Sequence, residues 1–225
     1  MAVYKIFPAA DATLYSKFPS QNTGLDPILE VAAKNNEDYN NSLAANNPFG
    51  VVTNDDVRRS LIRFSDTDLQ KIKKYCTGSW QAGLKLYLAE AENLSTTYSI
   101  EVRQVSQSWD MGTGRFQDSP EVRNGVCWYN TSSYYSGSVS WNVTPSNYFI
   151  TPGGGSWTNL VATQSFDYNS SKDLNVDVTS IVNSWFSASY SNNGFVVKFP
   201  ITVESSSASY VGLSFFFFFT HTIYP

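Results

Sequence analysis

Alternation of side chains with a period of two most restricts the fold of this sequence. It recurs in four short segments, residues 84–88, 98–102, 174–178 and 195–199. Successive side chains of a β-strand point to opposite faces of a sheet, so each segment would turn one face toward a core. The pattern therefore predicts an antiparallel two-sheet sandwich. Its expected core residues are Leu84, Leu86, Leu88, Ile100, Val102, Phe195 and Val197.

Five further segments are rich in strand-forming residues and are bounded by Gly, Asn or Pro turns. They are residues 12–16, 28–33, 60–64, 159–166 and 210–218. Two short helices are expected between the strands. Residues 66–75 carry acids in the first turn and lysines in the last, as the helix dipole favours, and residues 178–185 place apolar side chains at i, i+3, i+4 and i+7. Many strands and little helix predict an all-β fold.

The organisation of the chain is that of one domain. The sequence contains no internal repeat and no interdomain linker, so residues 1–225 are predicted to form a single unit. Two stretches are expected to lie outside the core as long loop excursions. Residues 35–56 are rich in Asn, and residues 127–157 mix aromatic side chains with Ser, Asn and Gly. Long loops in compact domains are often functional.

The low and slightly negative charge restricts the classes of partner. Only 15% of residues are charged, and the formal net charge is -4. Binding to nucleic acid or to an anionic membrane surface needs a concentrated positive patch, so neither partner is expected. The longest apolar run is five Phe at residues 215–219, far shorter than a membrane-spanning helix. The N-terminus has no apolar stretch before Pro8, so export by a signal peptide is not expected.

The reactive side chains give little support to an enzyme. His221 is the single histidine, and no nucleophile motif lies near it. Asp55 with Asp56, and Asp66 with Asp68, are interpreted as turn and helix-start residues, because no spacing places two carboxylates across a cleft. No metal or cofactor site is predicted. Cys76 and Cys127 could form a disulfide, but a reducing cytoplasm favours buried free thiols.

Three segments together resemble the DNRLRE-domain family. Residues 56–64 (DVRRSLIRF) resemble the strand that gives the family its name, and residues 106–110 (SQSWD) resemble its central Trp segment. Residues 177–185 (DVTSIVNSW), followed by 192–198 (NNGFVVK), resemble its helix-turn-strand segment. The resemblance implies a jelly-roll sandwich. Some relatives in that family are polysaccharide-binding modules.

A narrower resemblance is to virion structural proteins of T4-like cyanophages and other marine myophages. It rests on YKIFPAADATLYSKFP near the start, SQSWDMGTGRFQDSP, DLNVDVT, and THTIYP at the end. It implies a structural component of a tailed phage particle, located in the virion and made in the host cytoplasm. Its partners would be other virion proteins and copies of itself in a homo-oligomer. A carbohydrate-binding jelly roll that recognises host or algal polysaccharide is the alternative.

The aromatic side chains of the second loop excursion are the candidate binding residues. They are Trp128, Tyr129, Tyr134, Tyr135, Trp141 and Trp157. Tyr and Trp anchor protein interfaces and can also stack on sugar rings; the virion resemblance favours the interface. Trp109 and Trp185 are instead expected in the core. Arg58, Arg59 and Arg63 are expected to pair with Asp or Glu across the sandwich.

The C-terminal segment carries a separate expectation. Five consecutive Phe at residues 215–219 would put Phe on both faces of a strand, so we expect them to be buried in the sandwich or under another chain. A final strand that seals a sheet leaves no unpaired edge. Because similar virion proteins continue beyond this point, we expect the native protein to extend past Pro225.

Overall fold

The structure is a computed structural model of the 225-residue chain. It describes residues 3–34, 56–75, 78–92, 97–133, 139–141, 154–167, 169, 171, 173–204, 211–216 and 222–224. Tyr134, Tyr135, Cys76, His221 and Pro225 lie outside the described residues, as does most of the predicted 35–56 excursion.

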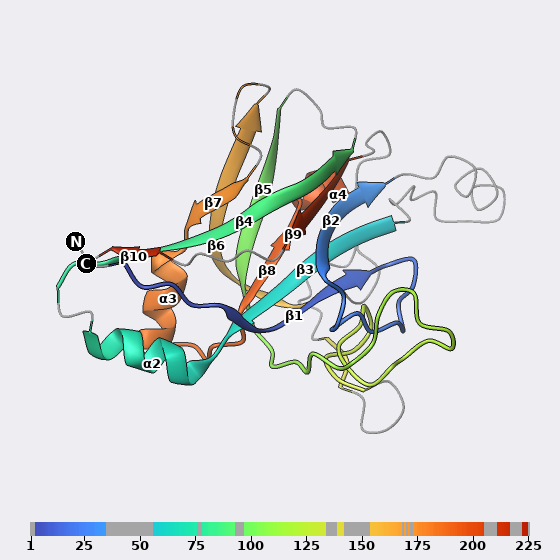
Figure 1. The fold of residues 1–225 in the computed structure, drawn as a ribbon, viewed down its shortest axis with the longest axis horizontal. Helices are drawn as coiled ribbons and strands as arrows, with labels where there is room; N and C mark the ends of the chain where they lie inside the picture. Colours follow the sequence, from blue (N-terminus) through green and yellow to red (C-terminus); the bar gives the residue numbers. More distant parts are fainter. Residues whose placement is uncertain are drawn as a thin grey trace.

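Strands dominate the described part of the chain (Figure 1). The strands are β1 (Pro8–Tyr15), β2 (Ile28–Lys34), β3 (Asp56–Phe64), β4 (Gln81–Glu92), β5 (Thr97–Val105), β6 (Trp157–Asp167), β7 (Leu174–Asp177), β8 (Phe195–Lys198), β9 (Val211–Phe216) and β10 (Thr222–Tyr224). The helices are α2 (Asp66–Tyr75), α3 (Thr179–Phe186) and α4 (Ile201–Glu204). The predicted helices at 66–75 and 178–185 are confirmed as α2 and α3. The single-turn α4 and the short β10 were not predicted.

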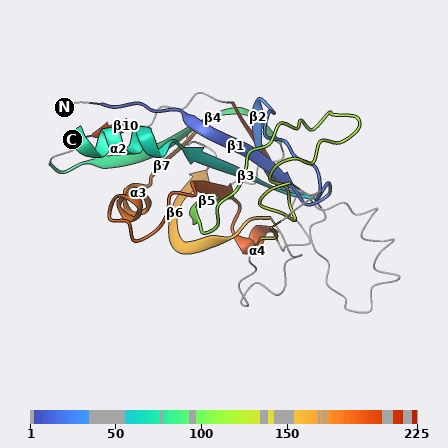
Figure 2. The same ribbon diagram turned by 90° about the horizontal axis from the view of Figure 1, so that it is seen from below.

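Strand β3 joins the two layers of the fold. Asp56–Arg58 pair with β2, the following Ser60–Ile62 pair with β8, and β1 pairs with residues 58–64 as well. One layer continues from β2 through β9 to β4, and the other from β8 through β5 to β6. Every described strand pair is antiparallel. Figure 2 shows β2 and β4 above β5 and β6. The predicted antiparallel two-sheet sandwich is confirmed.

The main core lies between the layers. Leu84, Leu86, Ile100, Val102, Phe195 and Val197 are all buried there, and Leu88 packs against it while partly buried. The predicted core is therefore confirmed. Helix α3 adds Ile181, Val182 and Trp185 to the same core, and α2 adds Leu69. Phe215 is buried as expected, whereas the side chains of the other four Phe lie outside the described residues.

A second core covers the outer face of β1, β3 and β8. It consists of Ala10, Ala12, Leu14, Val57, Leu61, Val105, Trp109, Val126, Trp128, Trp141 and Val196. Most of this cluster comes from strands, and the rest comes from loops between β5 and β6. The prediction that residues 127–157 lie outside the core is therefore wrong for Cys127, Trp128 and Trp141, which are buried. The physical reason is that β8 is buried on both faces, so Val196 needs a cover of its own.

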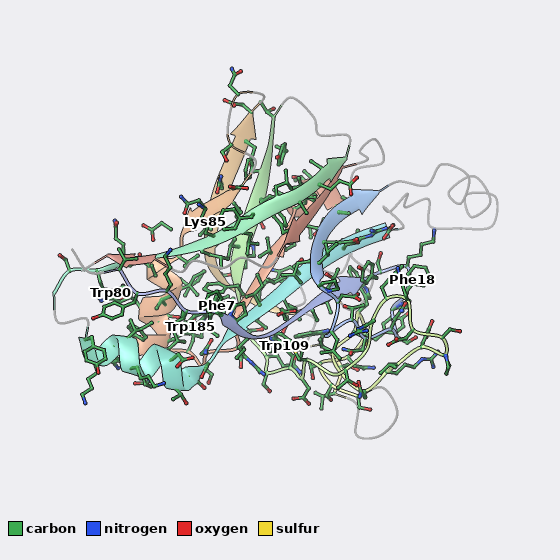
Figure 3. The ribbon with its side chains drawn as sticks, viewed as in Figure 1. Phe7, Phe18, Trp80, Lys85, Trp109 and Trp185 are labelled. Atoms are coloured by element: carbon green, nitrogen blue, oxygen red, sulfur yellow. The ribbon has the colours of Figure 1, made fainter. Side chains whose placement is uncertain are left out.

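Trp109 and Trp185 are both core residues, as predicted, but they belong to different cores. Figure 3 shows Trp185 near the helices and Trp109 nearer the loops. Trp109 also donates its indole N–H to the carbonyl of Asn193, at 2.9 Å. This bond ties the loop after β5 to the turn before β8. The outer loops are thus fixed to the sandwich.

Candidate functional site

An open groove lies where the turn after β1 meets the loop that follows β5. Its volume is about 540 Å³. Tyr15, Leu25, Pro27, Ile28 and Phe116 give it apolar walls, and Asp26, Glu30, Arg115 and Gln117 give it polar groups. Figure 1 shows the loop from residue 106 to 133, in yellow-green, beside β1 and the turn that follows it. Two segments about ninety residues apart in sequence thus build one groove.

Asn22 holds the two segments together from inside. It is fully buried, and its Nδ2 donates to the carbonyls of Met111, at 2.7 Å, and Val126, at 2.8 Å. Its Oδ1 accepts the N–H of Gly114 at 2.7 Å. The segments approach so closely that a Cβ on Gly24 would lie 2.1 Å from the Met111 carbonyl oxygen. Only glycine fits there, so this contact fixes the position of the groove.

Phe116 is fixed through its backbone. Asp26 accepts its N–H with both carboxylate oxygens, each at 3.1 Å. Gln21, which is buried, donates from Nε2 to the Phe116 carbonyl at 2.5 Å and to the Arg115 carbonyl at 3.2 Å. Both backbone polar groups of Phe116 therefore have protein partners. The ring is presented by a rigid loop rather than by a freely moving one.

Three exposed apolar side chains border the groove. The exposed fractions are 39% for Phe116, 37% for Phe18 and 44% for Leu25. The Phe116 ring lies 4.8 Å from the Tyr15 ring and meets the Phe18 ring edge-on at 5.3 Å. Exposed large apolar side chains that gather in one place mark interaction sites more often than scattered ones do. We call Phe18, Leu25 and Phe116 the apolar rim.

The groove contains an ion-pair network and two groups whose pKa is raised. Arg58 pairs with both Glu30, at 2.5 Å, and Asp56, at 2.6 Å. Burial raises the pKa of Tyr15, and Glu30, which accepts the Tyr15 hydroxyl, raises it further. Burial also raises the pKa of Asp26. The hydrogen bond from the Phe116 N–H and the charge of Arg115 lower the pKa of Asp26. The charges of Glu30 and Asp118 raise it further.

A second cluster of charged residues lies on the outer face of β3 and β8, beside the second core. Glu204 receives two bonds from Arg59, Nη2 to Oε2 at 2.8 Å and Nε to Oε1 at 3.1 Å. Lys198 Nζ lies 3.4 Å from Glu204 Oε2 and 3.8 Å from Glu101 Oε2. Burial lowers the pKa of Lys198, and Glu204 opposes that shift. Arg59, Lys198 and Glu204 are almost wholly buried and pair with each other, so we interpret the cluster as structural.

The prediction that the arginines pair with acids is confirmed for Arg58 and Arg59, but neither pair crosses the sandwich. Arg58 pairs with Asp56 of its own strand and with Glu30 of the neighbouring β2, and Arg59 pairs with Glu204 of α4. Arg63 instead donates to the carbonyl of Trp109 at 2.9 Å, and its guanidinium lies 5.0 Å from the centre of the Trp109 ring. It therefore helps to hold the second core rather than to pair two layers by charge.

The predicted binding aromatics do not form one exposed surface. Trp128 and Trp141 are 1% and 4% exposed in the second core, so their ring faces are covered. Trp157 is half-buried, and Arg59 lies between it and Trp128, 5.1 Å and 4.9 Å from the ring centres. Tyr129 alone of the described four is exposed. Tyr134 and Tyr135 lie outside the described residues.

Tyr129 nevertheless lies near the apolar rim. Its N–H donates to the carbonyl of Pro19, the residue after Phe18, at 3.2 Å. Val139, also exposed, belongs to the neighbouring turn, where its carbonyl accepts the N–H of Thr131 at 2.8 Å. The exposed apolar residues of the loops therefore extend from the rim along this end of the molecule.

Sequence reasoning missed the groove itself. Tyr15 lies in the predicted strand 12–16, Asp26 lies between that strand and the next, and Phe116 stands in a loop without periodicity. The available signal was local: Gly112-Thr113-Gly114 next to an exposed aromatic indicates a backbone that approaches another segment closely. Gly112 has a φ of 74°, which confirms the need for glycine at that position.

Within the described ranges, no group of three or more His, Cys, Asp or Glu side chains is placed to hold a metal ion. Cys127 is buried with a free thiol, and burial raises the pKa of that thiol. None of the helices that the structure describes is long and apolar enough to cross a membrane.

The groove offers an aromatic ring, carboxylates and a guanidinium, which are groups suited to binding.

Comparison with known proteins adds no family: no protein-family model matches the chain, and no curated protein matches it.

Proposed function

We propose that this chain is a structural component of a tailed bacteriophage particle and acts through protein–protein contacts. Its place would be in association with the capsid, neck, tail or fibre. Its partners would be other virion proteins and, in a homo-oligomer, copies of itself. The sequence likeness to virion structural proteins supports a place in a phage particle. The apolar rim supports action through protein–protein contacts.

The apolar rim is the observation that carries this proposal. Phe18, Leu25 and Phe116 are more than a third exposed, although the loops that bear them are tied to the sandwich by buried Asn22 and Gln21. Aromatic side chains dominate the binding energy of protein interfaces. Presenting them on a rigid scaffold reduces the ordering that association would otherwise require.

A carbohydrate-binding module is the second candidate, and the groove gives a specific reason for it. Phe116 supplies an exposed ring, and Asp26, Glu30 and Arg115 supply groups that could accept hydrogen bonds from sugar hydroxyls or donate to them. The Phe116 ring contacts Tyr15 on one side and the Phe18 ring edge-on, which leaves little flat surface for a sugar ring. This second proposal is therefore the weaker one.

The first experiment is quantitative mass spectrometry of purified phage particles produced from the genome that encodes this chain. We expect the chain at a fixed stoichiometry with the major virion proteins. Its absence from particles that are otherwise complete would overturn the proposal. Retention of the free chain on insoluble algal polysaccharide, without incorporation into particles, would support the carbohydrate-binding module instead.

Two variants test whether the apolar rim makes the contact. Phe116→Ser and Phe18→Ser should lower incorporation into particles while the free chain stays folded. Phe7→Ser is the matched control, because Phe7 is also exposed but lies away from Phe18 on the molecule (Figure 3). Equal incorporation of all three variants and the parent chain would show that the particle contact lies elsewhere.

A further inference from the structure

We propose that the groove holds an arginine or lysine side chain of a partner protein, with apolar neighbours of that side chain against Phe18 and Leu25. The inference rests on the proposed function, because it names the chemistry of the partner at the same surface. It follows from the sign of the charges in the groove and from the aromatic walls beside them.

Acidic groups outnumber basic ones at the groove. Asp26 and Glu30 line it, and Asp118 lies close enough to act on Asp26 electrostatically. Arg115 is the lining cation among the described residues, and it is exposed. The guanidinium of Arg58 is engaged by Glu30 and Asp56. A positive side chain entering the groove would therefore meet an excess of negative charge.

Asp26 is the group we expect the partner cation to contact. Both of its oxygens accept the same N–H, that of Phe116, and a carboxylate has about four acceptor sites. Its raised pKa has burial as the main cause, with Glu30 and Asp118 contributing. A cation at the groove would oppose this shift, so binding would lower the pKa of Asp26.

The aromatic walls suit the same occupant. The Tyr15 ring is buried and already carries the guanidinium of Arg58, 5.3 Å from its centre, so a partner cation would pack against the other ring of the groove. That ring is Phe116, which also lines the groove and is 39% exposed. The volume of about 540 Å³ is larger than one side chain requires, so the groove also admits part of the partner backbone.

An acidic segment is the competing occupant, because Arg115 could pair with it. The two occupants predict opposite effects for the same pair of variants. Asp26→Asn should weaken the binding of a cation, whereas Arg115→Gln should strengthen it by removing a repulsion. An acidic ligand would reverse both signs. A sugar, which depends on hydrogen bonds, would be weakened by both changes.

The probes are the acetyl methylamides of arginine, lysine and glutamate, titrated into the 225-residue chain. NMR chemical shifts of the Phe116 and Asp26 amides report occupancy. We expect the arginine probe to bind most tightly. Because it offers a single side chain, its Kd should be in the millimolar range. Asp26→Asn should raise that Kd about two- to fivefold, as for a partly exposed ion pair, and Arg115→Gln should lower it.

Two exposed charges on α2 supply matched controls. Asp68→Asn changes the net charge as Asp26→Asn does, and Lys71→Gln changes it as Arg115→Gln does, at a site away from the groove. Neither should alter the Kd for arginine. The side-chain amide that Asp26→Asn introduces would retain an oxygen to accept the Phe116 N–H, and an unchanged melting temperature would confirm that the variant stays folded.

The outcomes separate this inference from the proposed function. Shifts confined to the groove with arginine and lysine, and the two opposite effects of the variants, would support it. Binding of the glutamate probe, reversed signs, or no shift with arginine at about 20 mM would overturn it. If Phe116→Ser lowers incorporation into particles while arginine does not bind, the proposed function stands and the cationic partner is refuted.

Discussion

Replacing Arg59 by Met tests the buried charge cluster. The side chain of Arg59 has no exposed surface, and its guanidinium donates to Glu204 twice and to the Gly154 carbonyl at 2.7 Å. The variant would leave the Glu204 carboxylate buried beside Lys198, whose Nζ lies 3.4 Å away. Removing one partner of a buried ion pair costs about 3–5 kcal/mol. The melting temperature should then fall by about 6–20 °C, at about 2–4 °C per kcal/mol for a domain of this size.

The measurement is urea unfolding followed by far-UV circular dichroism, with the free energy of unfolding compared between variants. Lys71→Met is the matched control, because Lys71 pairs with Asp68 at the surface, where the two side chains are 66% and 43% exposed. That control should cost about 0–1 kcal/mol. If Arg59→Met destabilises the chain no more than Lys71→Met, the cluster does not hold the sandwich in the way we describe.

Three further predictions concern single buried groups. Asn22→Ala should speed hydrogen exchange in residues 111–126 and lower stability by about 2–4 kcal/mol, because it removes the hydrogen bonds of a buried side chain to Met111, Val126 and Gly114; unchanged exchange would refute its anchoring role. Burial raises the pKa of Asp11 from 3.8 to about 7, so the folded chain binds more protons than the unfolded chain between these values. Stability should therefore fall as pH rises from about 4 to about 7, and Asp11→Asn should flatten this slope in unfolding measured across that range. In a Cys76→Ser background, the thiol of Cys127 should react with iodoacetamide only slowly until urea is added, because it is buried and its pKa is raised. Equal rates with and without urea would contradict that placement.

The strands and the main core were predictable because they obey a simple period. Leu84, Leu86, Ile100 and Val102 alternate along their strands, and each is buried between the layers. Helix α2 was predictable from its end charges, Asp66 and Asp68 against Lys73 and Lys74. These signals are local, so a single sequence carries them.

The second core was not predictable by the same means. Trp128 and Trp141 come from loops, where no period tells a buried ring from an exposed one. Their burial depends on β8, whose Val196 faces outward and requires a cover. Trp141 also donates its indole N–H to the Cys127 carbonyl at 3.0 Å, which satisfies the polar end of a buried ring.

The candidate site was the least predictable feature, because it depends on contacts between distant segments. Asp26 and Phe116 are ninety residues apart and meet through one backbone N–H. Asn22 and Gly114 meet across a similar separation. Neither pair leaves a pattern in the sequence, whereas the Trp and Tyr residues of the 127–157 excursion are conspicuous there.

Hydroxyl-radical footprinting of the free chain and of the assembled phage particle tests the central claim most directly. Oxidation of Phe18 and Phe116 is measured by peptide mass spectrometry in both states, with each sample normalised to the same radical dose. The account predicts that both residues react in the free chain, where each is more than a third exposed, and become several-fold protected in the particle. Equal reactivity of Phe18 and Phe116 in the two states would contradict the claim that this surface joins the chain to its partners.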